Sequence, residues 1–167
     1  MELSSPGRKQ AVDSIWFTKD GTARVRYADE ARVVVRLGAD ETLTADTSTT
    51  MPRQRRGENG PVQLCPQPDG SIQILNSSTG IMSGVLVGHN AGVVRTELMK
   101  DASIGVSVSD DHTLRVWDIS NRRQLAIIVL SGPLTSLARA PGKDELLVGD
   151  ILGNVYWFSI VGVNAGR

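Results

Sequence analysis

A short pattern that recurs about every 40 residues limits what this chain can fold into more than any other feature of its sequence. The pattern is a polar turn followed by alternating apolar residues. Val33, Ile72, Leu114 and Val155 occupy equivalent positions in its four copies and are separated by 39, 42 and 41 residues. Recurrence at such a period is the signature of a repeat protein, in which each copy forms one supersecondary unit.

Each copy has the character of a small antiparallel sheet. Its apolar residues alternate with period two, and Gly, Asp or Asn, which favour tight turns, bound the segments. We find no stretch of helical length with apolar residues at the spacing of a helix face. The equivalent second strands are expected at Val25 to Ala28, Val62 to Cys65, Ile104 to Ser109 and Leu146 to Asp150. Innermost strands are expected at Asp13 to Thr18, Val93 to Leu98 and Leu134 to Arg139, and outer strands at Ile81 to Val87 and Leu125 to Leu130.

Four strands in about 40 residues is the size of one propeller blade. The sequence therefore predicts an all-β protein of about four four-stranded antiparallel blades, a partial or small β-propeller. The expected units are an N-terminal segment, four blades and a C-terminal tail, at residues 1–10, 11–45, 46–91, 92–132, 133–160 and 161–167. The second unit has Pro52 and a charge run where its innermost strand belongs, so we expect a degenerate blade or a surface loop there.

Composition excludes several classes of protein. Hydrophobic residues make up 40% and charged residues 22%, which is typical of a globular chain. The 18 basic and 18 acidic residues cancel, so no global field attracts nucleic acid or an anionic membrane. Cys65 has no partner for an intrachain disulfide, and one Cys with two His is too few for a zinc-finger-like site. We find no signal peptide and no apolar run of membrane-helix length, and expect a cytoplasmic or nuclear protein without a membrane partner.

The third unit carries the most specific motif. It reads Gly88-His89, then Val93-Val94-Arg95, then a segment from Ser107 that ends in Trp117-Asp118. Between them stands the turn Ser109-Asp110-Asp111-His112-Thr113. This combination resembles the WD-repeat family closely, because several elements occur at the right mutual spacing. The resemblance covers roughly residues 11 to 160. It is weaker in the other units, where Leu37, Asn76 and Ser159 replace the terminal Asp.

The resemblance implies a structural hydrogen-bond network. In the family, an Asp of the turn accepts a hydrogen bond from the Gly-His imidazole, which reaches a Ser or Thr on the second strand. That hydroxyl in turn reaches the Trp indole N–H. By position the members are His89, Asp111, Ser107 or Ser109, and Trp117, with the register of the two serines left open. We expect no catalytic, cofactor-binding or metal-ligating residues, and we expect His112 to be a turn residue and Asp150 to face solvent or form a local turn bond.

The resemblance also implies a function. WD-repeat proteins are mostly intracellular assembly platforms without catalysis, so we expect a protein-interaction scaffold or sensor module that binds other proteins or peptides. The last unit, Glu145 to Phe158, faintly resembles the closing blade of NACHT-type signalling ATPases that carry WD repeats. One alternative is a small propeller hydrolase using His89, Asp111 and a serine, although no Gly-x-Ser-x-Gly elbow is present. Another is nucleic-acid binding through the loop Arg53 to Arg56, which lacks interleaved aromatic residues.

The way the blades close is the last expectation. After Phe158 only nine residues remain, so the fourth unit lacks room for an outer strand. Residues 1–10 can supply that strand and lock a ring of four. Alternatively, two chains join into an eight-bladed ring, or further blades come from a longer chain. We favour the last two, because WD-repeat rings usually hold more than four blades.

Overall fold

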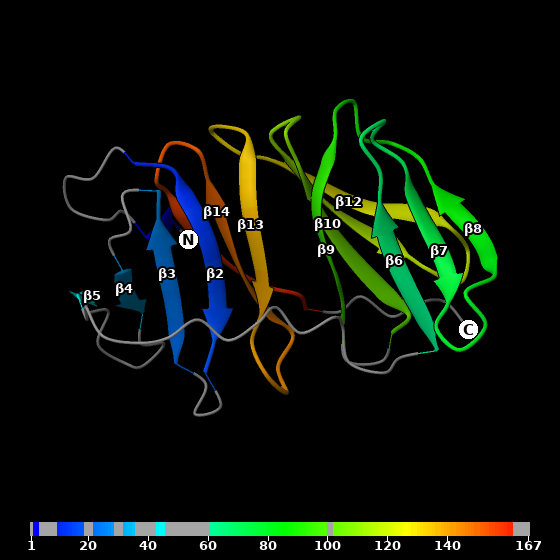
Figure 1. The fold of residues 1–167 in the computed structure, drawn as a ribbon, viewed down its shortest axis with the longest axis horizontal. Helices are drawn as coiled ribbons and strands as arrows, with labels where there is room; N and C mark the ends of the chain where they lie inside the picture. Colours follow the sequence, from blue (N-terminus) through cyan, green and yellow to red (C-terminus); the bar gives the residue numbers. More distant parts are fainter. Residues whose placement is uncertain are drawn as a thin grey trace.

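The computed structural model describes residues 2–3, 10–18, 22–28, 32–35, 43–45, 61–99 and 102–161. Within these ranges the chain forms fifteen strands and no helix, which confirms the all-β prediction (Figure 1). The described part accordingly holds no helix able to cross a membrane. Most strands lie where the period-two pattern predicts them, with bounds displaced by one or two residues, whereas the short strand Leu43–Ala45 was not predicted.

The strands form four antiparallel sheets. The first blade comprises β2 (Val12–Phe17), β3 (Ala23–Tyr27), β4 (Arg32–Val35) and β5 (Leu43–Ala45). The second comprises β6 (Val62–Pro66), β7 (Ile72–Asn76) and β8 (Met82–Leu86). The third comprises β9 (Val93–Leu98), β10 (Ile104–Ser109), β11 (Thr113–Asp118) and β12 (Arg123–Val129). The fourth comprises β13 (Leu134–Arg139), β14 (Glu145–Asp150), β15 (Val155–Ser159) and β1 (Glu2–Leu3).

The second and fourth blades depart from a simple run of four consecutive strands. The second has three described strands, and β6 occupies the second-strand position, so no described strand lies inside it. The stretch from Met51 to Gly60, with Arg53 to Arg56, lies outside the described residues. In the fourth blade β1 pairs with β15, with Leu3 opposite Val155, so a strand from the start of the chain lies at its outer edge.

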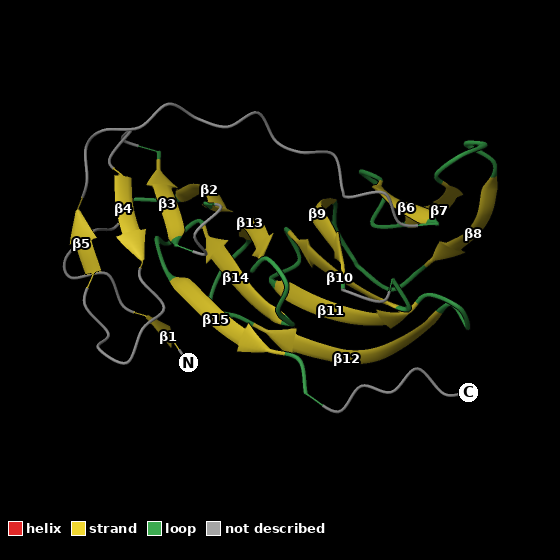
Figure 2. Ribbon diagram, turned by 90° about the horizontal axis from the view of Figure 1, so that it is seen from below, coloured by secondary structure: helices red, strands yellow, loops and turns green. Residues whose placement is uncertain are grey.

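The four blades follow one another in an arc. The innermost strand β13 packs against β2 on one side and β9 on the other, and β9 packs against β6. The order along the arc is therefore second, third, fourth, first (Figures 1 and 2). Among the described strands, no extensive contact joins the first blade to the second, and Figure 2 shows the two at opposite ends of the arc. Within the described ranges the assembly is a partial propeller, not a closed ring of four.

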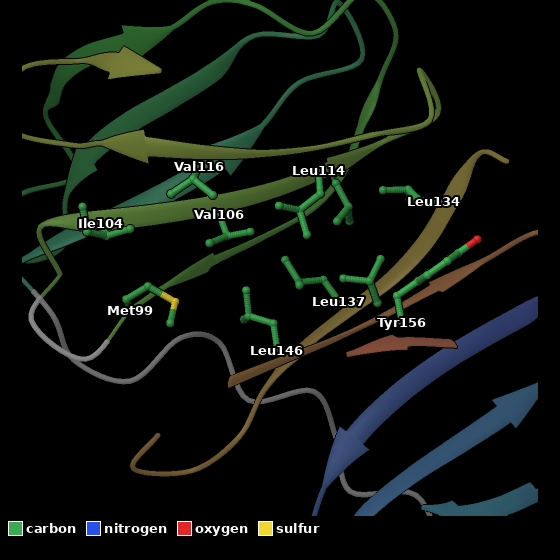
Figure 3. Close-up of a cluster of buried hydrophobic side chains, with 11 residues drawn as sticks. Met99, Ile104, Val106, Leu114, Val116, Leu134, Leu137, Leu146 and Tyr156 are labelled. Atoms are coloured by element: carbon green, nitrogen blue, oxygen red, sulfur yellow. The ribbon is translucent and has the colours of Figure 1, made fainter. Parts of the chain in front are cut away.

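Apolar layers between neighbouring blades make up the core. The largest joins the third and fourth blades, where the labelled side chains of the two sheets point toward one another in Figure 3. Its members include Val106, Leu114, Leu146 and Val148, each at most 1% exposed. A second layer joins the fourth blade to the first, and a third joins the second blade to the third. Since fully burying one such side chain contributes about 1.5–3 kcal/mol, these layers dominate the stability of the array.

Gly149 allows the fourth and first blades to approach closely. A Cβ atom at this position would lie 2.4 Å from Val12 Cγ1 and 2.5 Å from Ser136 Oγ. Val12 is fully buried, so the surrounding close packing prevents its side chain from moving away from a new methyl group.

We therefore predict that Gly149→Ala lowers the free energy of unfolding by about 1–3 kcal/mol through overpacking. The measurement is chemical denaturation followed by circular dichroism. Ala126→Val, an enlargement on the exposed strand β12, is the matched control and should change stability by less than about 0.5 kcal/mol. Equal stability of Gly149→Ala and the unmodified protein would contradict the close packing of these two blades.

Candidate functional site

A buried histidine lies between a carboxylate and a hydroxyl group in the third blade. His89 Nδ1 is 2.9 Å from Asp111 Oδ2, and His89 Nε2 is 2.7 Å from Ser107 Oγ. The indole Nε1 of Trp117 donates to the same Ser107 oxygen at 2.8 Å. The histidine and indole rings also meet edge to face, with centroids 6.1 Å apart. Four residues from four segments of the blade are thus joined in one chain of hydrogen bonds.

The local sequence explains why this histidine can enter the sheet interior. Gly88 precedes it, and a Cβ at Gly88 would lie 2.6 Å from Arg115 Nη1 and 3.0 Å from Trp117 Cη2. A larger residue at position 88 would require the end of the Arg115 side chain to shift and would crowd the Trp117 ring. The Gly-His pair therefore has a steric reason that is independent of the hydrogen bonds.

The protonation state of His89 follows from its surroundings. Burial lowers its pKa below the ordinary 6.5, although the neighbouring Asp111 carboxylate opposes this shift. The imidazole is therefore neutral at pH 7, with Nδ1–H donating to Asp111 and the Ser107 hydroxyl donating to Nε2. This tautomer is assigned from the network, in which Ser107 Oγ also accepts the indole N–H.

Asp111 binds the turn as well as the histidine. Its carboxylate accepts hydrogen bonds from Thr113 N and Oγ1, at 3.0 and 2.6 Å, and from Asn90 N at 3.0 Å. Burial alone would raise the pKa of Asp111, but the bonds from Thr113, Asn90 and His89 together lower it well below the ordinary value. The carboxylate is therefore ionised and saturated with donors, which fixes the turn between β10 and β11.

The structure separates the two serines whose register the sequence left open. Ser107, fully buried on β10, bridges His89 and Trp117. Ser109 lies two residues further on, where its hydroxyl donates to Ala91 O and Gly92 O and accepts from Asp111 N at 3.1 Å. Ser109 thus joins the turn to the preceding loop and makes no hydrogen bond to the histidine.

Equivalent turns in the second and fourth blades keep parts of this design. Asp69 accepts hydrogen bonds from Ser71 N and Oγ, as Asp111 does from Thr113, and these bonds lower the pKa of Asp69. The next position adopts positive φ in all three turns, at 86° for Gly70, 68° for His112 and 87° for Gly153. His112 is exposed and is therefore a turn residue in solvent, as its glycine counterparts predicted.

Of the two alternatives that the sequence left open for Asp150, the structure shows the local turn bond and excludes exposure to solvent. The Asp150 carboxylate accepts from Leu152 N and Asn154 N at 2.9 Å each. The residue is fully buried, and its second oxygen accepts from the Tyr156 hydroxyl at 3.0 Å. Asp150 stands where the third blade has Ser109, and Leu152 N bonds to it just as Asp111 N bonds to Ser109. That alignment, with a tyrosine nearby on β15, was the signal that could have located this second buried polar cluster.

The turns around these clusters share one end of the blades, which we call the upper rim: residues 87–92, 110–112, 130–133 and 151–154. Backbone hydrogen bonds tie each turn to the loop before its blade. Asp110 N donates to Gly92 O, and Ile151 N donates to Pro133 O. Exposed apolar side chains lie on or next to this rim, with Ile151, Leu152 and Val129 at 48%, 51% and 73% exposure.

The arrangement of His89, Asp111 and Ser107 matches a catalytic triad in residue types and distances but not in access. Ser107 has no exposed surface, and its oxygen is already engaged by the indole N–H. A nucleophile must reach a substrate carbonyl, which this hydroxyl cannot do without opening the blade. In the described part of the chain, no cluster of three metal-ligating side chains occurs.

Removing Asp111 should leave buried donors unpaired. We predict that Asp111→Ala lowers the free energy of unfolding by about 1–3 kcal/mol, and that Trp117→Ala lowers it by about 3–5 kcal/mol through the cavity left behind. Chemical denaturation monitored by fluorescence and circular dichroism gives both values. Asp110→Ala, at the exposed neighbouring position, is the control and should be nearly neutral. An unchanged melting temperature for Asp111→Ala would show that the network does not stabilise the blade.

The lowered pKa of His89 predicts how stability depends on pH. Because the unfolded chain binds the proton at higher pH than the folded one, the contribution of His89 is complete above the ordinary pKa of 6.5. It is lost as the pH falls below that value toward the folded pKa. We expect the melting temperature to fall between about pH 7 and pH 5, and to fall less in His89→Gln. His112→Gln, the exposed histidine, should behave as the unmodified protein. The same pH slope in His89→Gln would refute the assignment.

Comparison with known proteins agrees with this geometry. The family model of the TEP-1 C-terminal beta-propeller matches residues 89–160, the third and fourth blades. Ribosome biogenesis protein YTM1 of Candida glabrata is 30% identical over 84 residues, which are 50% of this chain and 16% of that protein. F-box/WD repeat-containing protein 15 of Mus musculus is 27% identical over 108 residues, 64% of this chain and 23% of that protein.

The chain thus spans less than a quarter of either relative. The designed protein Ika4 has the same fold, with a TM-score of 0.55 and 22% identity, over 94% of this chain and 96% of Ika4. Blade architecture, the Gly-His to Trp-Asp motif and these matches lead to one conclusion: the described residues have a β-propeller fold, and residues 89–160 are similar to known β-propeller and WD-repeat proteins.

Proposed function

We propose that this chain is a non-catalytic scaffold that binds other proteins or peptides through the upper rim. The observation that carries the proposal is the combination of rigid turns with exposed apolar side chains. The turns are held by the buried Asp111 and Asp150 clusters, whereas Ile151 and Leu152 project at 48% and 51% exposure. Rigid loops that display apolar groups favour recognition, because binding them costs little conformational entropy.

The burial and hydrogen bonding of the triad-like residues support a binding role rather than hydrolase activity. Every member of the triad-like set has a structural partner, and Ser107 is fully buried. A strained, exposed serine is what a nucleophile elbow provides, and β10 places Ser107 in the middle of a regular sheet instead. The net charge of zero supports protein over nucleic acid as the partner class, although Arg53 to Arg56 lie outside the described residues.

Two narrower expectations stay predictions. A sensor role in a larger signalling protein follows only from the faint NACHT-type resemblance of the last unit. A cytoplasmic or nuclear location follows only from the sequence composition. Both depend on what the whole protein contains, since the chain covers less than a quarter of the relatives described above.

The test compares partners captured by the unmodified chain and by a rim variant. We expect Ile151→Asp with Leu152→Asp to lose specific proteins from a cell-extract pull-down quantified by mass spectrometry. Ile81→Asp is the matched control, because Ile81 is 68% exposed in the turn at the opposite end of the second blade. Its partner set should be unchanged.

Two further measurements address the alternatives. A fluorophosphonate serine probe should leave Ser107 unlabelled, and oligonucleotides should not bind at physiological salt. Labelling of Ser107 would favour the hydrolase, and salt-dependent oligonucleotide binding would favour the nucleic-acid interpretation. Identical partner sets for the rim variant and the unmodified chain would rule out the upper rim as the binding surface.

A further inference from the structure

At every interface between blades, the same face of one blade packs on the opposite face of the next blade along the arc. We call forward the face of a blade that looks along the order second, third, fourth, first, and backward the opposite face. The forward face of the second blade packs on the backward face of the third through Leu64, Ile74 and Trp117. The third packs on the fourth, and the fourth on the first, in the same sense. One forward face and one backward face, at the two ends of the arc, are left without a neighbouring blade among the described strands.

Burial shows that these two end faces differ from the others. In the third blade every residue of β10 and β11 is buried, because both faces of the sheet are covered. In β7, the equivalent of β11, buried residues alternate with partly buried ones. In β3, the equivalent of β10, the same alternation occurs. The end blades are therefore covered on one face only within the described part of the chain.

The backward face of the second blade keeps apolar character despite this exposure. Leu75 and Cys65 are partly buried there, and Met82 and Val85 are 55% and 37% exposed. Two glutamines separate them, Gln63 and Gln73. Exposed apolar side chains that gather on one face of a sheet are typical of a contact surface.

The forward face of the first blade is amphipathic. Trp16 lies opposite Arg24 on the partly buried side of β2 and β3. Arg26 pairs there with Asp13 through a hydrogen bond from Nε at 2.6 Å. Ser14 lies on the same face, and its buried hydroxyl has no hydrogen-bond partner among the described residues. An aromatic ring and polar groups match a partner face that offers apolar side chains and glutamine amides.

We propose that two copies of this chain associate head to tail into a ring of eight blades. The forward face of the first blade in each copy packs on the backward face of the second blade in the other. Each chain thus carries both halves of one heterologous contact, which continues the interface already repeated three times within it. Propeller rings hold typically 4 to 8 blades, so two copies of four blades close within that range and three copies exceed it.

The mass of the protein in solution tests this proposal. Sedimentation equilibrium at micromolar concentration should give twice the 17.9 kDa of one chain. Val85→Glu buries a charge in the contact and should raise the dissociation constant about tenfold or more. Ile127→Glu is the matched control, because Ile127 is 46% exposed on β12, away from both end faces, and it should remain dimeric. Circular dichroism verifies that each variant keeps its strand content and melting transition.

A mixing experiment tests the head-to-tail geometry. Trp16→Lys alters only the forward face and Val85→Glu only the backward face, so each variant alone should be monomeric. In a mixture, one of the two contacts joins unaltered faces, and a heterodimer should form. A monomeric unmodified chain would overturn the proposal. Dimers that persist in Trp16→Lys alone, or that are lost equally in Ile127→Glu, would overturn the assigned faces.

Discussion

Everything in this structure depends on the need to cover both faces of every blade. A sheet such as β10 with β11 has apolar residues on both sides, Val106 on one and Trp117 on the other, so one packing partner is not enough. The third and fourth blades satisfy this requirement with a neighbour on each side. The end blades satisfy it on one side only, and their burial alternates accordingly. The same constraint that builds the array thus creates its two open ends.

The polar network answers a different requirement of the same sheets. The turns and loops bury backbone N–H groups where packing excludes water. Each buried N–H group therefore needs a hydrogen-bond acceptor within the protein. The Asp111 carboxylate accepts hydrogen bonds from Thr113 and Asn90. Further hydrogen bonds run from His89 through Ser107 to Trp117. Such a network specifies one arrangement of the blade, since partial satisfaction would leave costly groups unpaired. The residue types of a hydrolase therefore occur here in a role that depends on their being inaccessible.

Much of this was predictable because it is local. Strand positions follow from period two, and the positive φ of His112 follows from the glycines at equivalent turns. The burial of Asp150 was not predictable by the same reasoning, since a turn aspartate is ordinarily solvated. Its carboxylate is instead fully buried and accepts a hydrogen bond from the Tyr156 hydroxyl on the neighbouring strand β15. The degenerate inner strand of the second blade was anticipated at Pro52, which lies outside the described residues.

The sequence by itself determined the fold class and the repeat length, because these depend on local periodicity. The resemblance to WD repeats implied that His89, Asp111 and Trp117 belong to one motif. Only the tertiary structure decided between Ser107 and Ser109, because a shift of two residues keeps the same face of the strand but changes the reach to the histidine. It also decided that the fourth blade neighbours the first, and hence which faces remain open. Such contacts join residues more than a hundred positions apart, such as Thr135 with Val12, and no local pattern encodes them.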